Sequence, residues 1–73
     1  MAAGIHGAYE WEVNDGRLQI FSSTPKVGVL LELPISRGFD NAEQVQWFVQ
    51  GQIDTRLEEL ERLEAARIEE QQP

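Results

Sequence analysis

The chain of 73 residues has no cysteine, which excludes disulfides, thiolate metal ligands and cysteine nucleophiles. It has a single histidine and no glycine-rich phosphate-binding loop. No apolar run approaches the ~18 residues that a membrane span needs, and the N-terminus lacks the basic and apolar regions of a secretory signal. These absences predict a cytoplasmic protein with no catalytic residue, no cofactor and no membrane association.

Basic residues are also scarce: six Lys and Arg stand against thirteen Asp and Glu, for a net charge of −7. Residues 1–39 carry four acids and three bases, a balance of −1, while residues 40–73 carry nine acids and three bases, a balance of −6. Because no basic patch is available to displace counterions, direct binding to nucleic acid is disfavoured. A protein partner of basic character is favoured instead.

The length allows one small domain, 1–73, whose core alone gives marginal stability that oligomerisation often supplements. The order of patterns predicts an α+β fold of the type β-β-β-α. Residues 1–7 are expected to form a loose tail in which His6 is solvated, with pairing of Ile5 onto a sheet edge as the alternative. Residues 8–35 are expected to form a three-stranded antiparallel β-meander, followed at 40–71 by one long amphipathic helix.

A hairpin is predicted at Asp15 and Gly16, which lie between two alternating segments. An Asp-Gly pair suits the two central positions of a type I′ turn, because both require a positive φ. With these two residues as the loop, Trp11 pairs with Ile20, and a slip by one residue would mix the two faces. The register gathers an apolar set on one face: Tyr9, Trp11, Val13, Leu18 and Ile20.

A third strand is predicted at residues 27–33, before Pro34. Its odd-numbered residues are all apolar, so they are expected to face the helix, from Val27 onward. The alternate residues, including Leu30 and Glu32, are expected to face away from the helix.

The helix is predicted to begin at Asp40, which with Glu43 three residues later has the spacing of a capping box. Gly51 interrupts the helix, either as a tolerated surface glycine or as a bend. Trp47 flanks the apolar stripe and is expected to anchor the core together with Trp11, with a ligand-stacking pair as the alternative. The stripe contains Ala42, Val45, Val49, Ile53, Leu57, Leu60, Leu63 and Ile68.

The predicted helix is longer than the sheet that would cover it. From residue 42 to residue 70 it measures about 43 Å, whereas a strand of six or seven residues spans about 20–23 Å. About half of the helix would then lack a sheet of its own, so the distal half is expected to pair with the same helix of a second copy of the chain or with a partner's helix. The predicted oligomer interface comprises Ile53, Leu57, Leu60, Leu63, Glu64, Arg67 and Ile68.

A second surface is predicted on the sheet face away from the helix, where an apolar spot has an acidic rim. Its residues are Glu10, Glu12, Phe21, Leu30 and Glu32. The carboxylates could hold a hard cation, but three acids on one strand face are more often simply solvated, so no metal site is assigned.

These patterns favour a non-enzymatic interaction protein, such as an adaptor, an assembly factor or an accessory subunit. It would form a homodimer or higher oligomer through the helix and bind a basic protein partner through the sheet. An acidic inhibitor that mimics nucleic acid on a nucleic-acid enzyme, of the phage or mobile-element type, is one alternative. A small-ligand or metal-binding domain is the other.

Overall fold

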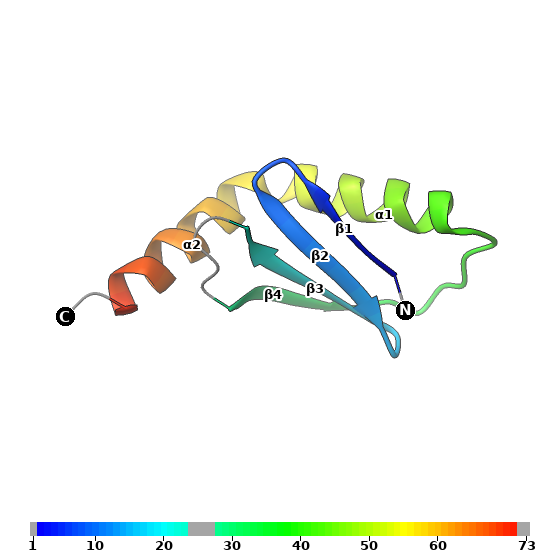
Figure 1. Ribbon diagram of the computed structural model, residues 1–73, viewed down its shortest axis with the longest axis horizontal. Coiled ribbons are helices and arrows are strands. Elements are labelled where there is room, and N and C mark those ends of the chain that lie inside the picture. The colour runs from blue at the N-terminus through cyan, green and yellow to red at the C-terminus, as the bar shows by residue number, and fades with distance from the viewer. Residues whose placement is uncertain (1, 24–27, 72–73) are drawn as a thin grey trace.

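Four antiparallel strands are followed by two consecutive helices in the computed structural model, which describes residues 2–23 and 28–71. The elements are β1 (Ala2–His6), β2 (Tyr9–Asn14), β3 (Arg17–Ser22), β4 (Val29–Pro34), α1 (Ala42–Thr55) and α2 (Leu57–Gln71). The strands lie in chain order, β1-β2-β3-β4. Both helices lie on one side of the sheet, and the end of α2 reaches past it (Figure 1). The predicted α+β class is confirmed, but with four strands and two helices in place of three and one.

The predicted hairpin between β2 and β3 is confirmed together with its register. Asp15 and Gly16 both have a positive φ, 51° and 73°, as a type I′ turn requires. Trp11 lies opposite Ile20 across the hairpin, as the alternation predicted. Trp11 is only 5% exposed and Ile20 is fully buried, so the apolar face of this hairpin is one wall of the core.

The prediction of a loose tail at 1–7 is wrong, because residues 2–6 form β1 and pair with β2 along their whole length. Gly7 and Ala8 make the connecting two-residue loop. Gly7 has a φ of 62° while Ala8 keeps an ordinary negative φ, which is the pattern of a type II′ turn. Within β1, Gly4 allows close contact with the core, since a Cβ there would lie 2.8 Å from the ring of Trp11.

Strand β4 contains a bulge that sequence alternation did not predict. Phe21 lies opposite Val29, whereas the residue before Phe21 lies opposite Leu31, so Leu30 is an extra residue on β4. Leu30 is 6% exposed and belongs to the core. The prediction that it faces away from the helices is therefore wrong, because the bulge shifts the alternation by one residue. The predicted strand start at Val27 lies outside the described residues.

The N-cap of α1 lies one residue later than predicted. Asn41 is the N-cap, and its side-chain oxygen accepts the backbone N–H of Gln44 at 2.9 Å. The side-chain oxygen of Gln44 reaches back and accepts the backbone N–H of Asp40 at 3.0 Å. The cap expected from Asp40 and Glu43 is thus made by Asn41 and Gln44, because Asn caps as well as Asp and Gln can replace Glu.

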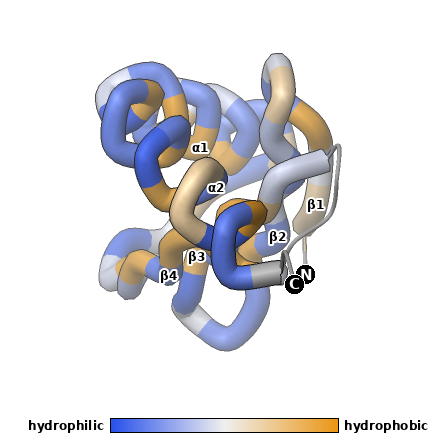
Figure 2. The backbone as a smooth tube through the Cα atoms, turned by 90° about the vertical axis from the view of Figure 1, so that its left-hand side faces the viewer, coloured by the Kyte–Doolittle hydropathy of each residue, from blue (hydrophilic) through white to orange (hydrophobic). Residues whose placement is uncertain are grey.

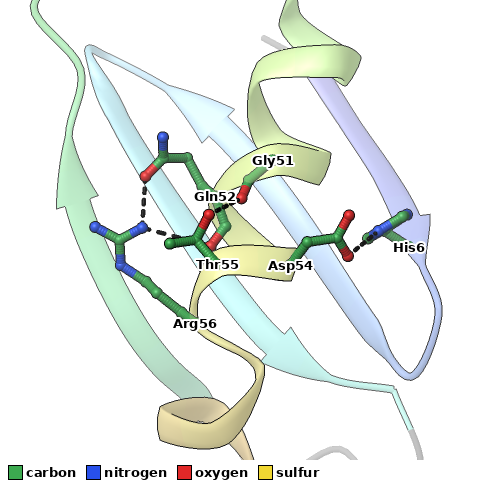
Figure 3. Close-up of polar contacts among 6 residues, drawn as sticks. All are labelled: His6, Gly51, Gln52, Asp54, Thr55 and Arg56. Atoms are coloured by element: carbon green, nitrogen blue, oxygen red, sulfur yellow. Dashed lines mark hydrogen bonds and ion pairs between the residues drawn. The ribbon is translucent and has the colours of Figure 1, made fainter.

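The predicted single helix bends at Arg56. The backbone N–H of Arg56 donates to the carbonyl of Ile53 at 3.0 Å. The carbonyls of the two residues before Ile53 accept hydrogen bonds from side chains. Arg56 Nη1 donates to the carbonyl of Gln52 at 3.4 Å, and the Thr55 hydroxyl donates to the carbonyl of Gly51 at 2.7 Å (Figure 3). Side-chain donors that take carbonyls of the preceding turn bend a helix.

The bend lets one helical segment cross the sheet from edge to edge. The helical hydrogen-bond pattern resumes directly after the bend, with the N–H of Leu60 donating to the carbonyl of Arg56 at 2.8 Å. Helix α1 contacts β1, while α2 contacts β4 at the opposite edge. The bend does not occur at Gly51, which is exposed and where an added Cβ would meet nothing within 4 Å.

The core lies between the sheet and both helices, where the hydrophobic stretches of the tube face one another (Figure 2). Leu60 of α2 is fully buried, and burial of one such side chain contributes about 1.5–3 kcal/mol. The first turns of α2 are therefore covered by the chain's own sheet, contrary to the predicted mismatch in length. The buried hydrophobic residues are Tyr9, Trp11, Leu18, Ile20, Leu30, Val49, Ile53 and Leu60.

Candidate functional site

The face of the sheet that points away from the helices, here called the outer face, holds most of the predicted partner-binding residues. Alternation along the strands places them there, because their neighbours Trp11 and Ile20 point into the core. Leu30 is the exception and lies in the core. The outer face comprises Ala3, Ile5, Glu10, Glu12, Arg17, Gln19, Phe21, Val29 and Glu32.

The two ends of the outer face differ in character. Near the β2-β3 turn, Glu32 accepts hydrogen bonds from Arg17 at 3.1 Å and from Gln19 at 2.8 Å. At the other end Ile5 is 65% exposed and lies opposite Glu10. A hollow of about 430 Å³ adjoins Ile5, lined by Ala3, Gly4, Ile5, Glu10, Trp11, Glu12 and Phe21. This end is apolar with an acidic rim.

Strand β1 is an edge of the sheet without the usual protection. Residues 2–6 contain no Asp, Glu, Lys, Arg or Pro, whereas β4, the other edge, has Glu32, a bulge and Pro34. In a hairpin with a two-residue loop, the two residues that flank the loop bond to each other through both of their backbone groups. Backbone groups of successive residues point to opposite sides of a strand, so the N–H and C=O of Ala3 and Ile5 point to the free edge. Within the described residues, no backbone group bonds to that edge. Such an edge is a template for another strand.

The residues of the predicted helix interface differ in how far they are exposed. Ile53 and Leu60 are fully buried in the core, so neither side chain has surface to offer a second chain. Leu57 is 42% exposed, while Leu63 and Ile68 are half-buried at the margin of the core. The polar members of the predicted set, Glu64 and Arg67, contact Ser22 and Glu70, respectively.

A buried polar contact attaches α2 to the sheet. The hydroxyl of Ser22, which is fully buried, donates to the carboxylate of Glu64. Tyr9 lies opposite Ser22 on β2 and is 4% exposed. Burial raises the pKa of Tyr9 above its ordinary value, and the charges of Glu64 and Glu61 raise this pKa further.

His6 is not the solvated tail residue that was predicted. Its Nε2 lies 2.8 Å from Oδ1 of Asp54, and this contact links the edge strand β1 to α1 (Figure 3). The ring is partly covered, with 28% of the side chain exposed, whereas the Asp54 side chain is 61% exposed. The carboxylate accepts the bond, so Nε2 carries the hydrogen. This contact positions β1 rather than forming a pocket.

A cluster of aromatic side chains at the start of α1 was not predicted from the sequence. Trp47, expected in the core, is 63% exposed. The guanidinium of Arg37 lies 5.0 Å from the ring centroid of Phe39 and 5.6 Å from that of Phe48. The two phenylalanine rings are 5.4 Å apart at an angle of 56°. A hollow of about 370 Å³ is lined by Arg37, Gln44, Trp47 and Phe48.

In the described part of the chain, no group of three or more His, Asp or Glu side chains is placed to hold a metal ion. There, too, no buried side-chain nitrogen or oxygen atom lacks a hydrogen-bond partner. Neither described helix combines the length and the apolar character of a membrane span.

No family model, no curated protein and no solved structure matches this chain. The candidate binding surfaces of the chain are the outer face, the free edge of β1, the exposed part of α2 and the aromatic cluster beside Arg37.

Proposed function

We propose that this chain is a non-enzymatic protein-binding module that associates with a second copy of itself through β1 and presents its acidic outer face to another protein. The observation that carries this proposal is the unprotected edge of β1 with Ile5, 65% exposed, beside it. An apolar edge strand in water gains stability by pairing with another strand.

Antiparallel pairing of two β1 strands is self-complementary. Each copy would offer the N–H and C=O groups of Ala3 and Ile5 to the same groups of the other copy, as a two-fold interface requires. Ile5 of each copy would then lie next to apolar side chains of its partner on the outer face. The pairing uses main-chain groups that β2 does not already bind, so it needs no rearrangement of the sheet.

The test is the molar mass in solution, measured by sedimentation equilibrium. We expect the unchanged chain to be a dimer and Ala3→Pro to be a monomer, because proline removes a backbone N–H that points to the free edge. The matched control Ala3→Ser keeps this N–H and should remain dimeric. A monomeric mass of the unchanged chain at high concentration would overturn the proposal.

The outer face supports binding of a basic partner. Glu10 and Glu12 flank the exposed Ile5, so lysine or arginine next to apolar side chains would complement this surface in charge and hydrophobicity. The proposed partner surface is the Ile5 end of the outer face, where Ile5 is 65% exposed.

The distal helix is a second candidate for self-association. Leu57 is 42% exposed, and the end of α2 extends beyond the sheet (Figure 1). This route has less apolar surface than the sequence suggested, because Ile53 and Leu60 are covered by the chain's own sheet.

A further inference from the structure

We infer that the hollow beside Arg37 binds a peptide segment in which one carboxylate side chain lies next to a large apolar side chain. The hollow is lined by Arg37, Gln44, Trp47 and Phe48. It lies at the start of α1, apart from β1 and the outer face, so this inference does not depend on the self-association proposed above.

Arg37 supplies a positioned cation. Its guanidinium lies over both Phe39 and Phe48, at 5.0 and 5.6 Å from their centroids, so the two rings restrict its orientation. Within residues 2–23 and 28–71, no carboxylate forms an ion pair with it. In a chain of net charge −7, this arginine keeps its N–H groups for an external acceptor.

Gln44 adds a second donor on the same side. Its side-chain oxygen already accepts the backbone N–H of Asp40 at 3.0 Å, which fixes the amide orientation and leaves its NH₂ group for a ligand. The polar groups of the hollow are thus donors from Arg37 and Gln44. A carboxylate accepts bonds from both, whereas an ammonium group would accept none.

The aromatic side chains of the hollow favour a peptide in which an apolar residue lies next to that carboxylate. Trp47 is 63% exposed, and a large exposed aromatic beside an arginine is the composition typical of binding hot spots. The hollow is an open surface of four side chains, so a free small molecule would keep much of its surface in water. A peptide, held by its backbone and neighbouring residues as well, fits this shape better.

Only one carboxylate is expected in the bound segment. Asp40 and Glu43 are exposed and close in sequence to the hollow, although neither lines it. Their charges act over roughly a Debye length, about 8 Å at physiological salt. Each further acid in the segment would add repulsion from these charges, and only an acid at Arg37 would have a cation beside it to offset that repulsion.

The probes are short peptides, acetylated and amidated, of the sequence Ser-Leu-Phe-Glu-Ser and its two relatives with Gln or Lys in place of Glu. Binding is followed by the NMR signal of the Trp47 indole N–H, assigned by its loss in Trp47→Phe. We expect the Glu peptide to bind about tenfold more tightly than the Gln peptide, the usual gain from a charge-assisted hydrogen bond. The Lys peptide should bind most weakly.

Two variants locate the effect. Arg37→Gln should remove the preference for Glu over Gln. Trp47→Ala, in which binding is followed by the backbone amide signal of Gln44 because the indole is gone, should bind both peptides more weakly by the same factor. Arg62→Gln, which makes the same change of charge at an exposed residue of α2 outside the hollow, is the control and should change neither affinity. Thermal unfolding of each variant checks the fold. Equal binding of the Glu and Gln peptides, tighter binding of the Lys peptide, or no shift of the indole signal by any peptide would overturn the inference.

Discussion

Tyr9, the only tyrosine of the chain, has a pKa that reflects its burial between the sheet and α2. Burial raises this pKa, and the charges of Glu64 and Glu61 add to the increase. In the unfolded chain the phenol ionises near its ordinary pKa, about 10. As pH rises, the unfolded state therefore loses its proton first, and the folded state is favoured less.

We predict that the free energy of unfolding does not depend on Tyr9 ionisation below a pH of about 10 and falls above it. Tyr9→Phe should show a shallower fall, because it has no phenol to ionise. Urea denaturation at a series of alkaline pH values measures both slopes. An equally steep fall in Tyr9→Phe would show that other groups control alkaline stability.

Individual residues were predictable where a regular period decided their environment. Trp11 lies in an alternating strand, so its burial followed from the pattern. Trp47 lies beside the helical stripe, and only contact with the sheet decides whether a flanking position is covered. Asn41 and Asp40 cap a helix almost equally well, so the sequence left the first residue of α1 open by one position.

At the scale of elements, the bend at Arg56 is produced by side chains rather than by Gly51. Gly51 is exposed, lies inside α1 and has open space around it. We predict that Gly51→Ala raises the free energy of unfolding by about 0.5–1 kcal/mol, because alanine loses less conformational entropy in a helix than glycine does. Urea denaturation monitored by circular dichroism measures the change.

Thr55→Val is the companion variant. It keeps the shape of the side chain but removes the hydroxyl that bonds to the Gly51 carbonyl at 2.7 Å. If Gly51→Ala instead destabilised the chain, the glycine would be needed for the bend, and the assignment of the bend to Thr55 and Arg56 would be wrong.

The sequence predicted some elements fully and others only in part. Asp15 and Gly16 specified a turn type, and that turn set the register of β2 and β3. Gly7 and Ala8 are a weaker turn signal, so the sequence predicts a tail where the structure has β1. The bulge at Leu30 was not predictable from alternation, because an extra residue is visible only in the pairing with β3. That bulge removed one residue from the predicted partner surface.

At the scale of the whole molecule, β1 and α2 are the two surfaces through which we propose that two copies associate. We predict that Leu57→Glu leaves the dimer intact, because the helix offers only Leu57 as a well-exposed large apolar residue once Ile53 and Leu60 are buried. Sedimentation equilibrium of Leu57→Glu and Ala3→Pro side by side decides this. A monomeric Leu57→Glu with a dimeric Ala3→Pro would assign the contact to α2.

The sheet covers more of the helical segment than its length predicts, because the segment is neither straight nor parallel to the strands. With a bend at Arg56, the helical segment crosses the sheet obliquely, from β1 to β4. The chain still extends 45 Å along its longest axis. The sequence could not show that crossing, since it depends on contacts between distant residues rather than on a local period.

The difference between the two sheet edges limits how far assembly can go. Because β4 ends in Pro34 and contains both a bulge and Glu32, it is a poor acceptor for a further strand. Two chains joined at β1 would therefore close growth at a pair, with both remaining edges capped. An open-ended filament, which unprotected edge strands can form, would have no suitable sheet edge for a third subunit.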